Sequence, residues 1–214
     1  MIERNLMYME KIKYDILKNE LKTGDIILFS GQYEMSKIVE KIEGSLWSHV
    51  GMVMRLPEYD FPLLYEATDL TNLPDLLHHD HITGPKVVNL KKRLETYGED
   101  VKPYQPPLYS VRRLKNPLPE TSTEILVNIL NKLHGVPNPD TLDMILETLL
   151  GRYLHIKSTS KTMTCSAFMA FTYEHLGLLK GDMPINGYAP KDFSTDGHLK
   201  IINNSLSDEI LIEL

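Results

Sequence analysis

The chain has 214 residues, of which 42% are hydrophobic and 24% charged, a composition typical of a globular protein and not of a disordered or collagen-like chain. Its 23 basic and 29 acidic residues give a net charge of −6, which argues against nucleic acid as the main partner because phosphate binding needs a basic surface. The single cysteine, Cys165, excludes an internal disulfide framework and a zinc site built from several cysteines.

The expected elements follow from two kinds of pattern. Apolar residues at a spacing of three to four predict helices, and short apolar runs bounded by glycine or proline predict strands. The predicted helices are an N-terminal helix within residues 1–21 and helices over 34–42, 120–133, 140–150 and 164–178. The predicted strands are residues 25–29, 47–54, 63–68, 86–90 and 108–114, with 47–54 and 63–68 forming an antiparallel hairpin. Five or more strands with these helices predict an α+β fold.

The sequence also predicts how the chain is organised and where it is located. No repeat and no linker-like composition interrupts residues 1–214, so we expect a single domain. No run approaches the roughly 18 apolar residues that span a bilayer. The N-terminus carries mixed charge where a secretory signal has basic residues and an apolar core. We therefore expect a cytoplasmic protein without a transmembrane segment.

Cys165 falls in the first turn of a predicted helix, where Thr162 or Thr164 could cap the chain. At that position the helix dipole and the free N–H groups would lower the pKa of the thiol and stabilise the thiolate. The alternative is an inert buried thiol, because cysteine is among the residues most often buried.

His49 and Glu66 belong to the two runs of the predicted hairpin. Strand alternation places His49 on the face opposite to the one that carries Val50 and Met52. Gly51 next to it indicates close approach of another chain or a ligand, so we expect this face to be open to a substrate. If the hairpin turns midway along its proline-containing connection, Glu66 lies opposite or diagonal to His49 on the same face. A histidine on a solvated strand face and an ordinary exposed acid are the alternatives.

The three residues together form a Cys-His-acid set whose roles can be stated. Cys165 would attack an acyl carbon, and His49 would take the thiol proton and return it to the leaving group. Glu66 would fix the tautomer of the ring and stabilise the imidazolium. The backbone N–H of Cys165, with one further donor, would stabilise the oxyanion.

Four segments resemble the circularly permuted branch of the NlpC-type papain-like cysteine hydrolases, a branch related to lecithin retinol acyltransferase. They are LKTGDIIL at 21–28, WSHVGMV at 47–53, YEA at 65–67 and TCS at 164–166. In this branch the histidine strand precedes the nucleophile helix, as it does here. The resemblance implies a permuted papain-like α+β core and a catalytic triad of Cys165, His49 and Glu66.

The resemblance leaves the substrate open, since some branches are similar to cell-wall peptidases and others to lipid acyltransferases or phospholipases. We expect an amidase that cleaves a small acyl-amino acid or peptide and needs no cofactor. An acyltransferase or phospholipase acting on a lipid ester is the alternative. A further alternative is a non-catalytic module that binds lipid or a partner helix, although methionine and leucine at helical spacing are more often core. Its residues would be Met144, Leu146, Leu149, Met163 and Met169.

Four further residues are expected near the substrate. Tyr33, Trp47 and Gly51 are predicted to line the cleft. Asp25 would bind a substrate amine or would serve the turn after Gly24, and aspartate is more common in the second role.

A histidine-rich segment gives a rival interpretation. His78, His79, Asp80 and His81 could supply metal ligands, but adjacent histidines in a strand point to opposite faces, and catalytic zinc sites use ligands held more rigidly than in a loop. The sequence therefore predicts a solvated loop here and no metal site.

Overall fold

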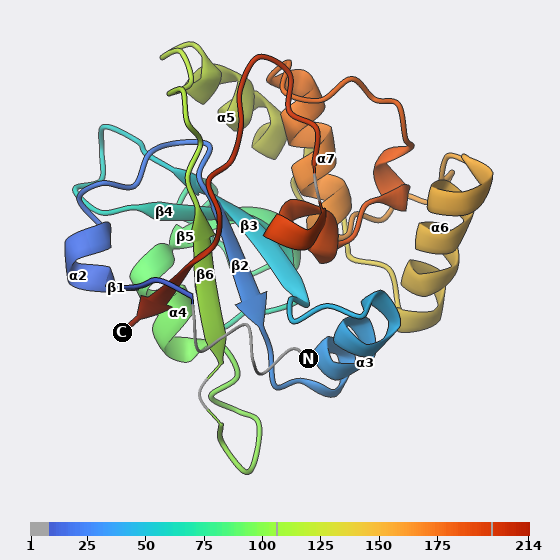
Figure 1. Ribbon diagram of the computed structural model, residues 1–214, viewed down its shortest axis with the longest axis horizontal. Coiled ribbons are helices and arrows are strands. Elements are labelled where there is room, and N and C mark those ends of the chain that lie inside the picture. The colour runs from blue at the N-terminus through green and yellow to red at the C-terminus, as the bar shows by residue number, and fades with distance from the viewer. Residues whose placement is uncertain (1–8, 106, 198) are drawn as a thin grey trace.

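A seven-stranded sheet forms the centre of the computed structural model, which describes residues 9–105, 107–197 and 199–214 (Figure 1). The strand order is β1-β7-β6-β2-β3-β4-β5, and neighbours are antiparallel except for the parallel pair β1 and β7. The strands are β1 (Lys11–Lys13), β2 (Ile26–Ser30), β3 (His49–Met54), β4 (Leu63–Thr68), β5 (Gly84–Asn89), β6 (Leu108–Arg112) and β7 (Ile210–Glu213).

Helices pack around this sheet, so the α+β class expected from the sequence is confirmed. The α-helices are α2 (Tyr14–Leu17), α3 (Glu34–Glu43), α4 (Leu90–Thr96), α5 (Ser122–Leu133), α6 (Thr141–Leu154) and α7 (Cys165–His175). The 3-10 helices are η1 (Ile185–Gly187), η2 (Pro190–Phe193) and η3 (Thr195–Gly197). Among the described residues, none of the helices combines the length and the apolar character that crossing a bilayer requires.

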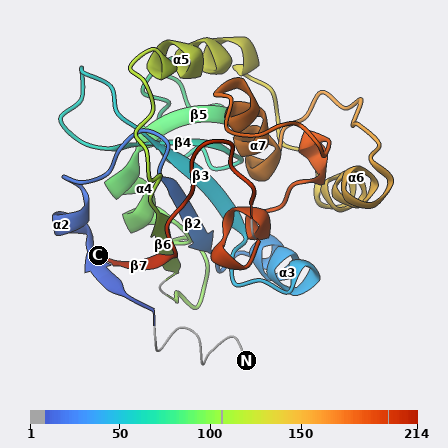
Figure 2. The same cartoon turned by 45° about the horizontal axis from the view of Figure 1, so that its top comes forward.

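Both faces of the sheet are buried, because alternate residues of its central strands enter two different cores. Ile26 and Leu28 of β2 belong to the core that α5 and α7 cover. Ile27 and Phe29 belong to the core that α4 and α2 cover. The sheet therefore separates α7 from α4 (Figure 2). The face that carries His49 was expected to be open to a substrate, but every residue of β3 is buried, and of this strand His49 alone lines the cleft described below.

The predicted N-terminal helix within residues 1–21 is wrong where the structure describes it. Lys11–Lys13 form the edge strand β1, whose Ile12 pairs with Ile212 of β7, and only Tyr14–Leu17 are helical. The apolar spacing of this segment comes from one strand and one helical turn, in which Ile16 stays 58% exposed. The part of the prediction that concerns residues 1–8 lies outside the described residues.

The predicted hairpin is confirmed and sets the register of the site. Met52 of β3 pairs with Tyr65 of β4 in antiparallel fashion. One step along, Gly51 faces Glu66, so His49 lies diagonal to that carboxylate on the same face of the sheet. The sequence does not predict the helix α4 or the strand β7. The helix α4 packs against β4 and β5, and β7 lies at the other side of the sheet between β1 and β6.

Candidate active site

Cys165 is the first residue of α7, in the first helical turn as the sequence predicts. The hydroxyl of Thr164 caps the helix by accepting a hydrogen bond from the N–H of Ala167 at 3.1 Å. The amide of Cys165 has no partner inside its own helix, as is general for the first turn. The half-buried thiol therefore lies at the positive end of the helix dipole.

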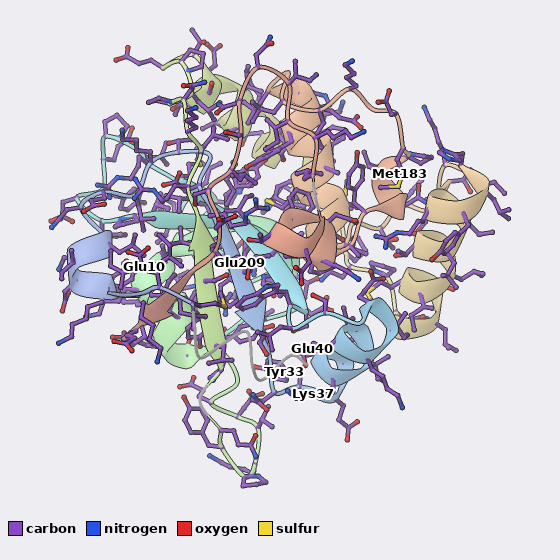
Figure 3. The ribbon with its side chains drawn as sticks, in the orientation of Figure 1. Glu10, Tyr33, Lys37, Glu40, Met183 and Glu209 are labelled. Atoms are coloured by element: carbon purple, nitrogen blue, oxygen red, sulfur yellow. The ribbon has the colours of Figure 1, made fainter. Side chains whose placement is uncertain are left out.

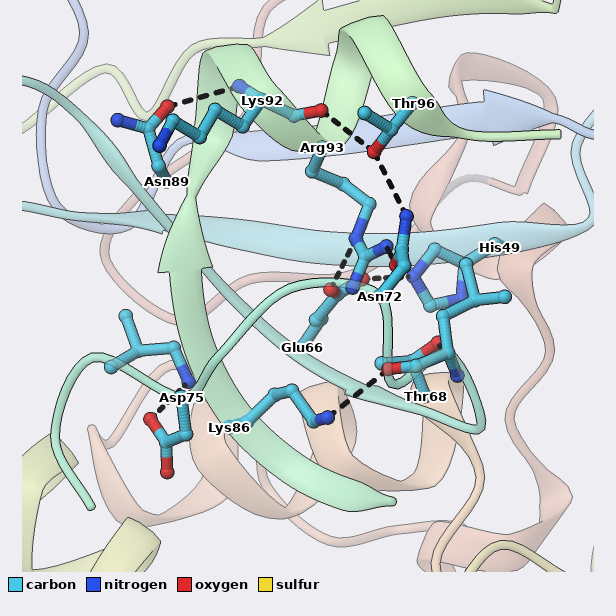
Figure 4. Close-up of polar contacts among 12 residues, drawn as sticks. His49, Glu66, Thr68, Asn72, Asp75, Lys86, Asn89, Lys92, Arg93 and Thr96 are labelled. Carbon is cyan, nitrogen blue, oxygen red and sulfur yellow. Dashed lines mark hydrogen bonds and ion pairs between the residues drawn. The ribbon is translucent and has the colours of Figure 1, made fainter. Parts of the chain in front are cut away.

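His49 is the first residue of β3, and its ring contacts the carboxylate of Glu66. The distance from Nε2 of His49 to Oε2 of Glu66 is 2.8 Å, and both side chains are buried (Figure 4). Because Glu66 engages Nε2, the other ring nitrogen, Nδ1, is left for Cys165, which lines the same cleft as His49 and whose charge acts on its ring. The structure thus brings all three predicted residues together.

The three groups shift each other's ionisation. Burial by itself lowers the pKa of His49, but the charge and hydrogen bond of Cys165, together with those of Glu66, raise it to about 9. Burial would raise the pKa of Cys165, but the charge and hydrogen bond of His49 and the N–H groups of Val50 and Ser166 lower it. Both shifts favour a thiolate beside an imidazolium.

A second cation stabilises the charge of Glu66 from behind. Nε of Arg93, in α4, donates to Oε1 of Glu66 at 2.7 Å, and Nη1 donates to Oδ1 of Asn72 at 2.8 Å (Figure 4). Burial favours the neutral form of Glu66, yet the Arg93 guanidinium and the hydrogen bonds from His49 and Arg93 lower the pKa of Glu66 to about 2. The acid is therefore charged throughout the neutral range.

Two aromatic rings fix the imidazole on its other sides. Phe29 meets the His49 ring edge to face at a centroid distance of 5.1 Å, and Tyr97 stacks on it at 6.0 Å with an interplanar angle of 22°. Both rings are buried, so His49 has little rotational freedom. The sequence does not identify Tyr97, since it follows the unpredicted helix α4 and reaches the site only through the fold.

A cleft of about 280 Å³ exposes the reactive atoms. Cys165 and His49 lie in its wall together with Tyr33, as predicted for Tyr33. The Tyr33 hydroxyl donates to Oδ1 of Asp100 at 2.8 Å, which holds this ring at the start of α3 near Lys37 and Glu40 (Figure 3). The segments 67–70 and 138–139 also line it, as do Met35, Ser36, Val39, Ser48, Tyr97, Met144 and Thr164.

Two residues that were predicted to line the cleft, Trp47 and Gly51, have other roles. Trp47 is 2% exposed in the core, where its Nε1 donates to Glu209 at 3.1 Å, so it is not part of the cleft wall. Gly51 admits a neighbouring side chain and not a ligand, because a Cβ there would lie 2.7 Å from Leu64. The prediction of these two residues as substrate contacts is wrong.

Asp25 is also unavailable to a substrate amine. Its buried carboxylate accepts hydrogen bonds from the N–H groups of Lys22 and Leu114 and from Nε of Arg113, the last at 2.7 Å. The alternative role in the turn after Gly24 is the one that the structure shows.

The histidine-rich segment contributes one member to a different cluster. Within the described residues, donor atoms of Asp75, His78 and His134 lie within 4.8 Å of one another. His79 and His81 are not members, so the run itself does not form a ligand set. None of the cluster's residues lines the cleft at Cys165.

Comparison with known proteins gives few matches. No family model matches the sequence. The chain is 36% identical over 100 residues to the uncharacterized protein R372 of Acanthamoeba polyphaga mimivirus, a stretch that covers 41% of this chain and only 38% of that relative. A solved structure, the metalloprotein yiiX of Escherichia coli O157:H7 (DUF1105), is 18% identical with a TM-score of 0.49, covering 87% of this chain and 89% of that one.

Proposed function

We propose that this protein is a cysteine hydrolase of the permuted papain-like type that works through an acyl-enzyme on Cys165. The observation that supports this most is the position of His49, whose Nε2 lies 2.8 Å from the buried carboxylate of Glu66 and whose ring lines the same cleft as Cys165. A structural cysteine needs neither a buried imidazole partner nor a buried carboxylate behind that partner.

The proposed reaction has two halves. The thiolate of Cys165 attacks the acyl carbon, and the new oxyanion accepts a hydrogen bond from the backbone N–H of Cys165. The imidazolium of His49 gives its proton to the leaving nitrogen or oxygen as the C–N or C–O bond breaks. A water then gives a proton to His49 and attacks the thioester, which releases the acid and restores the thiol proton to the Cys165–His49 pair. Glu66 keeps Nε2 protonated and stabilises the imidazolium throughout.

A small acyl-amino acid or peptide amide is the first candidate substrate. The cleft of about 280 Å³ is close to the lower end of the size range of small-molecule sites.

A lipid ester is the second candidate, favoured by an apolar groove that also reaches Cys165. Val39 and Ile42 of α3 line one side of this groove, and Ile145 and Leu149 of α6 line the other. The two helices are neighbours at the same side of the molecule in both ribbon views (Figures 1 and 2). An acyl chain would gain about 0.8 kcal/mol for each methylene buried there.

The five residues named for a non-catalytic binding groove lie in different parts of the structure. Met163 and Met169 are buried core residues, whereas Leu146 is exposed. Met144 and Leu149 both line the apolar groove at Cys165. These two of the five residues therefore share a surface, and it is the one proposed for an acyl chain.

A chain-length series separates the two substrate candidates. We expect kcat/KM for acetyl, butyryl and octanoyl p-nitrophenyl esters to rise about fourfold for each methylene that the groove buries. The variant Ile145→Glu should remove this preference, and Leu142→Ala, on an exposed position of α6, should keep it. A preference for acetyl substrates, with cleavage of the matching anilides, would instead support the small amide.

Alkylation tests the proposed ion pair directly, because any thiol signal comes from Cys165. We expect iodoacetamide to modify the native protein rapidly at neutral pH and His49→Ala to slow the reaction several-fold. His49→Ala keeps the Glu66–Arg93 pair, so the fold should survive. Modification only after denaturation would show an inert thiol.

Turnover should fall as pH rises through about 9, because the raised pKa keeps His49 protonated below that value.

A further inference from the structure

We propose that Asp75, His78 and His134 bind a divalent transition-metal ion, for which Zn²⁺ is the best fit. The three residues come from two segments, the loop before β5 and the residue after α5. Their donor atoms lie within 4.8 Å of one another, close enough for small side-chain rotations to bring them onto one ion. This site does not depend on the proposed function of Cys165.

The hydrogen bonds of His78 are compatible with a role as a metal ligand. Its Nδ1 lies 2.6 Å from Oδ2 of the fully buried Asp75, and its Nε2 lies 3.0 Å from Oδ1 of Asn131. Both nitrogens thus face oxygen acceptors, which the ring satisfies either as an imidazolium or as a neutral imidazole that has a metal ion at one nitrogen. An ion bound by Nδ1 and the Asp75 carboxylate would replace the proton at Nδ1, and the bond from Nε2 to Asn131 would then fix the tautomer.

His134 and Asp80 add unused ligand atoms beside this pair. The His134 ring stacks on His78 at a centroid distance of 3.8 Å, and its Nε2 lies 3.0 Å from Oδ2 of Asp80. Within the described residues, the buried atoms Nδ1 of His134 and Oδ1 of Asp80 have no hydrogen-bond partner. Buried polar atoms without partners are rare, and a missing ion is one explanation for them.

The charges and donor types favour a metal of the zinc kind. With neutral imidazoles, the carboxylates of Asp75 and Asp80 give the site a charge of two negative units, which matches a divalent cation. Imidazole nitrogens combined with carboxylate oxygens suit zinc better than calcium or magnesium, which prefer oxygen ligands alone.

The site would join two segments whose ends form the cleft wall. Leu70 lies a few residues before Asp75, Asn138 lies a few residues after His134, and both line the cleft with Cys165. The segments already approach closely, since a Cβ at Gly84 would lie 2.0 Å from the carbonyl oxygen of Val136. We infer a structural metal that holds this side of the cleft in place.

The test uses full-length protein carrying Cys165→Ala, so that no thiolate competes for the metal. Calorimetric titration with Zn²⁺, and the visible absorption of bound Co²⁺, should show one equivalent per chain. His134→Ala and His78→Ala should each lower the affinity at least about tenfold. His81→Ala, an exposed histidine of the same loop outside the cluster, should leave it unchanged.

Two outcomes would overturn the proposal. One is the absence of stoichiometric binding in the Cys165→Ala protein, and the other is equal loss of affinity in His81→Ala and His134→Ala. Thermal unfolding gives a second measurement: Zn²⁺ should raise the unfolding midpoint of the Cys165→Ala protein and not that of His134→Ala. Circular dichroism of each variant, recorded without metal, establishes that the loss of binding is not a loss of fold.

Discussion

Replacement of Cys165 by alanine is expected to lower kcat by a factor on the order of 10⁴ to 10⁶, the usual cost of removing the nucleophile of a triad. The variant keeps the cleft and the N–H groups at the start of α7, so only the attacking atom is lost. The measurement is kcat on the best ester or anilide of the chain-length series. The exposed Ser160, which precedes α7, provides the matched control Ser160→Ala, which should keep full activity.

Stability gives this prediction its check on folding. Cys165 is half-buried and small, so its replacement should change the free energy of unfolding by only about 1 kcal/mol, close to the average for point mutations. A folded Cys165→Ala protein that keeps native turnover would exclude covalent catalysis by this cysteine. The Cys165→Ala protein should also bind non-reactive substrate analogues as tightly as the parent does, since the walls of the groove and the cleft are intact.

The parts of the site that could be predicted are those governed by local rules. Strand alternation and a single connection determine the β3–β4 register, and this register places Glu66 diagonal to His49. Capping chemistry places Cys165 at the start of α7, because Thr164 is a good N-cap residue. Each of these contacts depends on residues that are near in sequence or are joined by one turn.

The parts that could not be predicted depend on packing between distant segments. Arg93 reaches Glu66 from a helix with little periodic signal, although its N-cap, Asn89, follows a known pattern. Gly51 does mark a close approach, but from sequence alone a ligand and the side chain of Leu64 are equivalent explanations. Trp47 is an aromatic residue next to the histidine strand, yet it packs into the core and its indole N–H finds its acceptor in the distant Glu209.

Replacement of Arg93 by leucine is expected to destabilise the protein by about 3–5 kcal/mol, the cost of removing one partner of a buried ion pair, and it leaves His49 as the remaining partner of Glu66. Both Arg93 and Glu66 have 0% side-chain exposure, so water cannot replace the lost guanidinium. Urea unfolding measures the effect, and Lys91→Leu is the control on the same helix. Lys91 and Glu95 are half exposed, so breaking their pair should cost less than about 1 kcal/mol.

The same reasoning changes how Glu66 should be tested. From sequence, Glu66→Ala is expected to keep the fold and lower turnover, but in the structure it leaves the buried Arg93 without its anion. Glu66→Gln keeps an oxygen for Arg93 and removes the charge that stabilises the His49 imidazolium. We therefore expect Glu66→Gln to lower kcat and to move the alkaline limit of turnover below pH 9, with a smaller loss of stability than Glu66→Ala.

Acid pH distinguishes an electrostatic cost in Arg93→Leu from a simple loss of packing. In the parent the pKa of Glu66 is lowered to about 2, so its stabilising charge is present above the unfolded value near 4.5 and is lost as pH falls through about 2. Burial raises the pKa of Glu66, and without Arg93 less positive charge counteracts this effect, so the pKa rises. In the variant Glu66 therefore takes up a proton on folding at mildly acid pH. The difference in unfolding free energy between parent and Arg93→Leu should therefore shrink from pH 7 to pH 4. A difference that stays constant over this range would mean that Arg93 stabilises the site through its volume and not through its charge.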